Sequence, residues 1–335
     1  MRPLRDKRLP QVSYAAECKY YGDALRVGRQ EPMDPISRRK FVALIATGVA
    51  ATPLARSMGS AVTAQEVVDR IRKNIGVDWK SETVDTFKSG DPSTAVTGIV
   101  TTALASLEVL GSAVKAGANL IVTCEPVFFA KADTPTPPVR RGFGAPDTPP
   151  SPPPPDPVFS AKDDFIRKHN LVVWRFSDHW RLRTPDPFAQ GLVSVLGWSK
   201  SAGDPRHLSI PETSLDGLVA HVKKSLKSRG GMRIVGDPQL RVQKVALLPG
   251  STPIQASLEA LPGADVIIAG EVREWESVEY VRDTVALRGK KALILVGRIV
   301  SENPGMQACA QWLKTVVPEV ASTWVPVADP YWRPM

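Results

Sequence analysis

The chain has 335 residues, which is enough for about two ordinary domains or one elaborate domain with a substantial core. Its formal net charge of +9 is concentrated near the start. Residues 1–64 hold 11 of the 43 Lys and Arg residues but five of the 34 Asp and Glu residues, so the remaining 271 residues carry a net charge of only +3. Because no basic stripe remains, the composition argues against nucleic-acid binding. Three cysteines are too few for a disulfide framework.

Residues 33–64 carry a targeting signal. Residues 37–42, Ser-Arg-Arg-Lys-Phe-Val, resemble the twin-arginine export motif, and the apolar segment 42–55 is too short to span a bilayer comfortably. Small residues just before Gln65 provide a cleavage site. We therefore predict a leader over residues 1–64, recognition by the twin-arginine export machinery, no stable membrane span after cleavage, and a periplasmic or exported bacterial protein. The alternative is a basic tail that contains two adjacent arginines by chance.

The first lobe, residues 65–198, alternates between helical and strand patterns. The expected elements are helices at 65–75, 103–116, 160–169 and 188–196 and strands at 96–100, 120–122 and 171–176. A strand, a helix and a second strand within about 30 residues form a βαβ unit, which favours a sheet with parallel strands. Eleven prolines between positions 135 and 157 interrupt the pattern, and we interpret the segment 133–157 as a proline-rich surface insertion.

The second lobe, residues 199–320, repeats the alternation after a polar linker at 199–211. The expected elements are helices at 215–226, 254–261, 274–288 and 304–316 and strands at 232–235, 242–248, 264–269 and 292–296. Residues 321–335 are expected to form an extended tail. The pattern predicts an α/β protein with mixed sheets in two intertwined lobes.

Four of the predicted strands end in polar side chains. Cys124 and Glu125 end one strand of the first lobe, and Asp178 and His179 end another. In the second lobe, Glu271 ends the strand at 264–269 and Glu302 follows the last strand. Sheets of α/β proteins carry their chemistry at the carboxyl ends of the strands. We therefore expect these side chains to converge on one polar, metal-related site.

Several motifs along the chain carry a resemblance to a known family. They are Gly90-Asp91-Pro92, Cys124-Glu125-Pro126, Asp178-His179-Trp180, Gly263-Ala264-Asp265 through Gly270-Glu271, and the run from Gly297 to Glu302. In this order they resemble the Nif-three-like family of dinuclear metal-centre hexameric proteins, also labelled GTP cyclohydrolase type I homologues of a second type. The resemblance covers roughly residues 65–320. It implies the Nif-three-like fold, a homo-oligomer that is expected to be a hexameric ring, two metal ions inside the ring, and a suspected hydrolase activity.

The resemblance also implies a set of metal ligands. It places them at Cys124, Glu125, Asp178, His179 and Glu302, with Asp186 as a substitute. Arg298 stands where the family has a histidine, and a guanidinium group has no lone pair with which to coordinate a cation. We therefore predict a partly degraded centre that holds fewer than two divalent ions of zinc, manganese or iron and that could activate water for hydrolysis.

Two other interpretations remain open. In the first, the protein is a metal-free structural or binding hexamer in which Arg298 replaces the metal and pairs with Glu125 or Glu302. In the second, Cys124 is the nucleophile of an enzyme, with His179 as its base and Asp178 orienting the imidazole. Metal content distinguishes the first from a metal-dependent hydrolase, and the reactivity of the thiol tests the second.

Overall fold

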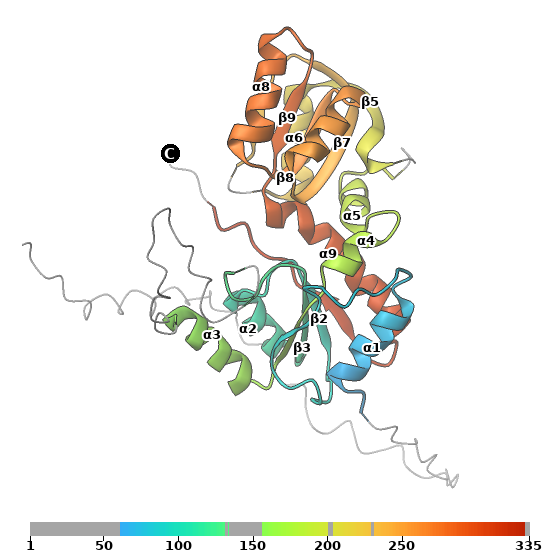
Figure 1. Ribbon diagram of the computed structural model, residues 1–335, viewed down its shortest axis with the longest axis vertical. Coiled ribbons are helices and arrows are strands. Elements are labelled where there is room, and N and C mark those ends of the chain that lie inside the picture. The colour runs from blue at the N-terminus through green and yellow to red at the C-terminus, as the bar shows by residue number, and fades with distance from the viewer. Residues whose placement is uncertain (1–60, 131–132, 134–155, 200–203, 229–230, 332–335) are drawn as a thin grey trace, which may run out of the picture. The chain divides into compact units, whose positions relative to one another are not determined.

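The computed structural model describes residues 61–130, 133, 156–199, 204–228 and 231–331 (Figure 1). The twin-arginine motif at 37–42 lies outside these ranges, as does nearly all of the proline-rich insertion predicted at 133–157. The described residues form a mixed α/β structure with two five-stranded sheets, which confirms the predicted fold class.

The first sheet has the strand order β1-β4-β3-β2-β10. Its strands are β1 (Phe87–Ser89), β2 (Ile99–Thr102), β3 (Leu120–Thr123), β4 (Val172–Arg175) and β10 (Ser322–Trp324). Strands β10, β2, β3 and β4 are parallel, and β1 pairs with β4 in the antiparallel direction. Strand β10 comes from the segment expected to be an extended tail, so the C-terminal part of the chain returns to the first sheet.

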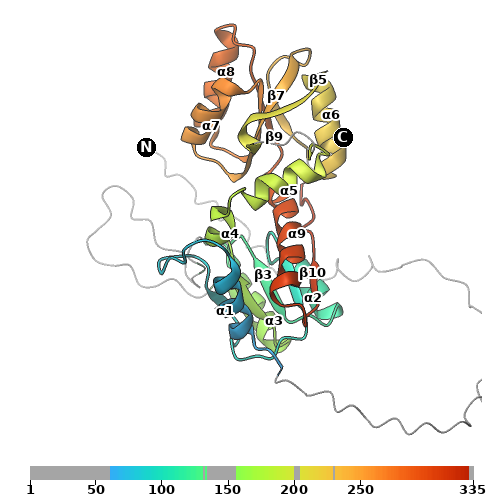
Figure 2. The same ribbon diagram turned by 90° about the vertical axis from the view of Figure 1, so that its right-hand side faces the viewer.

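Helices cover both faces of the first sheet (Figures 1 and 2). They are α1 (Ala64–Asn74), α2 (Leu107–Lys115), α3 (Pro157–Lys168) and the long helix α9 (Arg298–Val316). Within β3, Leu120 and Val122 pack into the core cluster that contains α1 and α9 residues, whereas Ile121 packs into the cluster that contains α2 and α3 residues. Burial on both faces explains why the parallel strands are short uninterrupted apolar runs in the sequence.

The second sheet has the strand order β5-β7-β8-β9-β6, with three parallel central strands and antiparallel edges. Its strands are β5 (Leu208–Ser214), β6 (Arg233–Val235), β7 (Arg241–Ser251), β8 (Val266–Glu271) and β9 (Ala292–Leu295). Residues of α5 (Pro187–Val195) and α6 (Leu215–Leu226) pack on one face, and residues of α7 (Ile254–Ala260) and α8 (Glu279–Ala286) pack on the other. A π-helical segment, Glu274–Val278, precedes α8.

Strands β1 and β10 and the short helix Asp178–Leu182 have no counterpart among the expected elements, and two further segments differ from the prediction. The segment expected to be a linker at 199–211 contains the start of β5, an edge strand in which Leu208 and Ile210 are buried while Ser209 is exposed. An edge strand tolerates Pro211, which has no amide hydrogen to donate to a neighbouring strand. Helix α9 begins at Arg298, six residues before the expected start. Proline is common in the first turn of a helix, but Pro304 lies inside this one.

The first helix begins within the segment assigned to the leader. Thr63 caps α1, because its hydroxyl accepts from the Glu66 amide (3.2 Å) and the Glu66 carboxylate accepts from the Thr63 amide (2.7 Å). Val62 is buried in the core. Val62 and Thr63 therefore belong to the folded unit, whereas cleavage directly before Gln65 would remove both residues. Within the described part of the chain, no helix is long and apolar enough to cross a bilayer.

Helices α5 and α9 cross at contact distance, and this crossing gives a test of the fold. A Cβ atom on Gly191 would lie 2.6 Å from the backbone carbon of Pro304. We predict that Gly191→Ala lowers the free energy of unfolding by about 1–3 kcal/mol, measured by urea denaturation, because neither backbone can yield. The control is Gly111→Ala on α2, where no atom lies within 4 Å and about 0.5–1 kcal/mol of stabilisation is expected. Equal effects of the two substitutions would contradict the described crossing.

Candidate functional site

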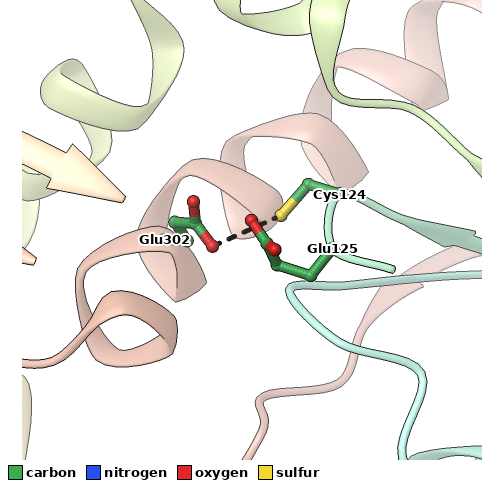
Figure 3. A group of neighbouring side chains, drawn as sticks. All are labelled: Cys124, Glu125 and Glu302. Atoms are coloured by element: carbon green, nitrogen blue, oxygen red, sulfur yellow. Dashed lines mark hydrogen bonds between the residues drawn. The ribbon is translucent and has the colours of Figure 1, made fainter. Parts of the chain in front are cut away.

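Cys124, Glu125 and Glu302 lie together where β3 ends against the first turns of α9 (Figure 3). One potential ligand atom from each side chain lies within 4.8 Å of the other two, and all three residues are buried. Within the described ranges, this is the one group of three or more His, Cys, Asp or Glu side chains with such geometry. The structure therefore brings together three of the five ligands that were predicted from the sequence.

The Cys124 thiol is held in a protonated state. Its Sγ atom donates to the Ala103 carbonyl oxygen at 3.3 Å and lies 3.8 Å from Oε2 of Glu302. Burial, together with the carboxyl groups of Glu302 and Glu125, raises the pKa of the Cys124 thiol well above its ordinary value. Only a thiolate attacks an electrophile efficiently, so the site does not activate this sulfur.

Each carboxyl group of the cluster faces a guanidinium group. Nη2 of Arg298 lies 2.8 Å from Oε1 and 2.7 Å from Oε2 of Glu125. Nη2 of Arg181 donates to Oε1 of Glu302, and Nε of Arg298 lies 4.0 Å from the same oxygen. That Nε atom is buried and makes no hydrogen bond within the described structure. Two permanent cations are therefore built into the cluster.

Burial governs the protonation of Glu302, which has no exposed surface. Burial and then the neighbouring Glu125 raise the pKa of Glu302 to about 8, although Arg181 and Arg298 act in the opposite direction. Desolvation thus outweighs the attraction of the two guanidinium groups. The raised pKa favours the protonated form of Glu302, and a protonated carboxyl group is a weaker metal ligand than an ionised carboxylate.

The end of β7 approaches the cluster through a glycine. Gly250 has φ +82°, and a Cβ atom there would lie 2.6 Å from Oε1 of Glu302 and 3.0 Å from Nη2 of Arg181. Its amide donates to the Ser301 hydroxyl at 2.9 Å. A side chain at this position would meet both steric and conformational resistance. The glycine therefore allows the second sheet to close over the Glu302 and Arg181 pair.

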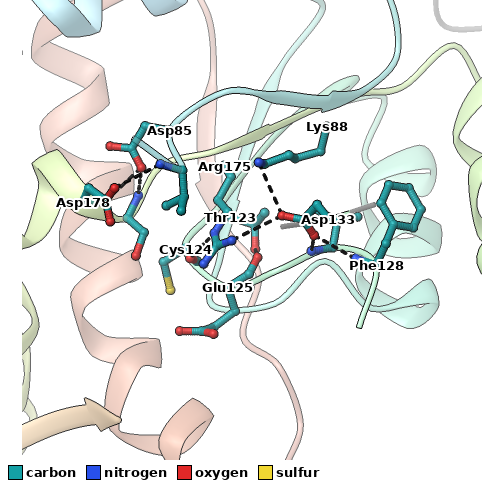
Figure 4. A network of polar contacts seen from close by, with 12 residues as sticks. Asp85, Lys88, Thr123, Cys124, Glu125, Phe128, Asp133, Arg175 and Asp178 are labelled. Carbon is teal, nitrogen blue, oxygen red and sulfur yellow. Dashed lines mark hydrogen bonds and ion pairs between the residues drawn. The ribbon is translucent and has the colours of Figure 1, made fainter. Parts of the chain in front are cut away.

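A buried ionic network fixes the backbone that carries Cys124 and Glu125 (Figure 4). Nε of Arg175 donates to the Cys124 carbonyl oxygen at 3.2 Å, and Nη1 lies 3.3 Å from Oδ2 of Asp133. Asp133 also lies 3.5 Å from Nζ of Lys88 and accepts from the Phe128 amide at 3.0 Å. These contacts hold the backbone beyond β3, which carries the side chains of Cys124 and Glu125.

Asp178 and His179 are not part of the group formed by Cys124, Glu125 and Glu302, and their side chains have other partners. Nδ1 of His179 lies 2.7 Å from Oδ2 of Asp85, and Nε2 accepts from the Lys80 amide at 2.8 Å. Oδ2 of Asp178 accepts from the Val84 amide at 3.0 Å. Because both ring nitrogens of His179 are engaged, the imidazole is neither a free ligand nor a base for Cys124.

The reason for this arrangement is a short helix, α4 (Asp178–Leu182), that follows β4. Asp85 accepts from the amides of Ser177 (2.6 Å), Asp178 (3.0 Å) and His179 (2.9 Å), so its carboxylate occupies the N-terminal end of α4. Asp186, the substitute ligand, accepts from the Phe188 amide at 2.9 Å and caps α5. Neither carboxylate is directed at the Cys124 cluster.

Arg181 and Asp85 are the residues that the sequence did not reveal. A five-residue helix has no periodic pattern, so α4 was not predicted and Arg181 had no assigned place. One signal was available. The predicted site has two carboxyl groups, Glu125 and Glu302, but only one cation, Arg298. One carboxylate would then lack a charged partner, and burial of an unpaired charge costs free energy. A second cation near the cluster could have been expected on that ground.

Comparisons with solved structures place this architecture in a known group. Staphylococcus aureus protein SA1388 superposes with a TM-score of 0.60 at 14% identity, over 82% of this chain and 99% of that chain. A Bacillus cereus protein related to NIF3 gives 0.58 at 13% identity, over 82% and 99%. Protein ybgI, of unknown function, gives 0.57 at 19% identity, over 80% and 99%. The chain has the NIF3-like fold.

A family model supports the same assignment for part of the chain. Residues 181–329 match Duf34/NIF3 (NGG1p interacting factor 3). The matched segment contains Arg181, Arg298 and Glu302, whereas Cys124 and Glu125 lie before it. No curated protein sequence matches the chain. The NIF3-like fold is therefore established by structure over most of the chain, and the family sequence pattern is found in its C-terminal part.

The state of the thiol can be measured directly. We predict that iodoacetamide at pH 7.5 modifies Cys124 about two orders of magnitude more slowly in the folded protein than in urea, because the sulfur is buried and protonated. Mass spectrometry of the Cys124 peptide gives the rate, and buried Cys309 in the same sample is an internal control. Alkylation of Cys124 faster than a free cysteine would instead support the nucleophile hypothesis.

A second prediction concerns Lys162, whose Nζ donates to the Val127 carbonyl oxygen at 2.6 Å. Burial lowers the pKa of Lys162 from 10.5 to about 8, although Asp133 acts in the opposite direction. Between these two pH values the unfolded chain binds more protons than the folded chain, so the Lys162 contribution to stability rises with pH. We predict that the stability of the wild type relative to Lys162→Met increases by up to about 3 kcal/mol between pH 8 and pH 10.5.

Urea denaturation at several pH values measures this difference. The control is Lys168→Met at an exposed position of the same helix, which should show the same pH dependence as the wild type. A pH-independent difference between the wild type and Lys162→Met would mean that Lys162 is as well solvated in the folded protein as in the unfolded chain.

Proposed function

We propose that this chain is an exported Duf34/NIF3 family protein in which two guanidinium groups take the place of metal ions, and that it acts as a binding or structural protein. One observation carries the proposal. Arg298 faces Glu125 and Arg181 faces Glu302, so the site is already provided with positive charge. The match of residues 181–329 to the family and the NIF3-like fold support the family assignment.

A dinuclear metal centre does not fit the described residues. Two ions need about six to eight protein donors, and the cluster offers Cys124, Glu125 and Glu302. The imidazole of His179 is engaged elsewhere. A guanidinium group remains charged and cannot coordinate a cation, so Arg181 and Arg298 would repel an incoming ion.

Charge balance explains why the replacement is chemically reasonable. Two guanidinium groups carry together the same charge as one divalent ion, and they satisfy carboxylate oxygens through hydrogen bonds. A single zinc, manganese or iron ion is the competing occupant, because one sulfur and two oxygen donors lie within 4.8 Å of one another. Binding of that ion requires both guanidinium groups to leave their carboxyl partners. The geometry therefore favours the metal-free interpretation.

The proposal extends to assembly and location. The resemblance to hexameric proteins supports a homo-oligomer, with a hexamer as the expected state. The twin-arginine motif at 37–42 supports a periplasmic or exported protein. Light scattering of the purified chain tests the first point, and cell fractionation with an Arg38→Lys and Arg39→Lys double variant tests the second. A monomer, or an unchanged distribution of the variant, would contradict the respective point.

Metal analysis tests the central claim. We predict that the wild type, purified without chelator, incubated with zinc or manganese and then desalted, retains less than about 0.1 ion per chain and melts at the same temperature in EDTA. The double variant Arg181→Ala and Arg298→His should retain about one zinc ion, because it frees both carboxyl groups and adds an imidazole. Arg298→His alone should gain less, since Arg181 still holds Glu302.

The matched control removes two guanidinium groups from the surface. Arg233→Ala and Arg241→Ala break the exposed pairs with Glu274 and Glu212 and should leave metal uptake unchanged. Near-stoichiometric metal in the wild type, together with a lower melting temperature in EDTA, would overturn the proposal without the need for any variant. It would assign the site to a single bound ion.

A further inference from the structure

A concave site lies on the side of α9 opposite Glu302. It has a volume of about 550 Å³ and is formed by the segment between α4 and α5, by α5 itself and by the middle of α9. Pro304 lines it, and Pro304 follows Glu302 by two positions, which at 3.6 residues per turn places the two residues on opposite sides of the helix. This volume is within the range of pockets that bind small molecules. We call it the α5–α9 pocket.

Aromatic side chains form one wall of the α5–α9 pocket. The rings of Trp180 and Trp312 have centroids 5.2 Å apart at an interplanar angle of 39°. Nε1 of Trp180 donates to the Gly305 carbonyl oxygen at 3.3 Å, which fixes that ring against α9. The close crossing of α5 and α9 at Gly191 places the opposite wall. Trp180 is itself 1 % exposed and supports Trp312 from behind, so the partly exposed ring of Trp312 is the rigid aromatic surface that suits a planar ligand.

A cation without an acidic partner stands beside these rings. The Arg183 guanidinium lies 5.0 Å from the Trp180 centroid and 5.1 Å from the Trp312 centroid. Arg183 is half-buried, and among the described residues no carboxylate lies within 4.0 Å of its nitrogens. Arginines that pack on aromatic faces keep their planar edge available for bidentate hydrogen bonds. The pocket thus offers one recognition point for an anion.

Amide side chains provide further polar groups. Gln190 lies on α5 and Gln307 lies on α9, and both line the pocket. Neither side chain hydrogen-bonds to another residue in the described part of the chain. No Asp or Glu is among the lining residues. The pocket therefore combines aromatic walls, one cation and neutral amides, and it contains nothing that repels a negative charge.

We infer that the α5–α9 pocket binds a small planar aromatic carboxylate, with the ring against the partly exposed Trp312 and the carboxylate on Arg183. One guanidinium matches one carboxylate in bidentate geometry, whereas a polyphosphate would need several cations. The glutamine amides supply hydrogen bonds to the edge of the ligand. None of these pocket residues belongs to the Cys124 cluster, so ligand binding in the pocket does not depend on the metal content of that cluster.

Isothermal titration of the full chain with naphthalene-2-carboxylate tests the inference, and the uncharged naphthalene-2-carboxamide is the matched probe. The wild type should bind the carboxylate at least about tenfold more tightly than the carboxamide, because a charge-assisted hydrogen bond is lost in the second probe. Arg183→Gln should reduce the affinity for the carboxylate to that for the carboxamide. Arg183→Lys should retain a preference for the carboxylate, and Arg206→Gln at an exposed position should change neither affinity.

Two results would overturn the inference. One is equal affinity of the wild type for both probes, which needs no variant and therefore does not depend on the folding of Arg183→Gln. The other is a change in the oligomeric mass of Arg183→Gln with unchanged affinity for the carboxylate, measured by light scattering, which would assign the pocket to contacts between copies of the chain. Near-ultraviolet circular dichroism shows whether each variant keeps the packing of its tryptophans.

Discussion

The burial of two carboxyl groups beside a thiol at the start of α9 is the constraint on which the site depends. Transfer of a carboxylate from water into a protein interior is costly unless hydrogen bonds and opposite charge accompany it. The chain meets this requirement with Arg298 from α9 and Arg181 from α4. Because α4 must deliver its arginine to Glu302, the position of that short helix follows from the electrostatics of the cluster.

Further charges fix the elements that carry the cluster. Asp85 occupies the N-terminal end of α4 and accepts three backbone amides, which sets where Arg181 points. Arg175 and Asp133 hold the chain beyond β3, which sets where Glu125 points. Each buried carboxylate in these layers is satisfied by protein groups. The backbone around the site is therefore organised by ion pairs and helix caps.

The sequence predicted the sheets better than the site, and the reason is physical. Strands such as β3 are buried on both faces, so they are short apolar runs that can be recognised without tertiary information. The ends of strands locate a polar region but not the direction of each side chain. The structure accordingly groups Cys124 and Glu125 with Glu302, whereas His179 contacts Asp85. Arg181 was missed because α4 is too short for a periodic signal. The start of α9 was misplaced because Pro304, usual in a first turn, lies within the helix.

Helix α9 connects the two sites on this protein through its opposite sides. Glu302 faces the carboxylate cluster, and Pro304 and Gln307 line the α5–α9 pocket. Helix α4 makes the same connection, because Arg181 contacts Glu302 while Trp180 lines the pocket and bonds to Gly305. The cores of the two sheets, and not the carboxylate cluster, bury most of the apolar side chains. The fold is therefore stabilised mainly by apolar burial in the two sheets. The groups in the cluster can differ without loss of the fold, and guanidinium groups can occupy the positions at which the resemblance implies metal ions.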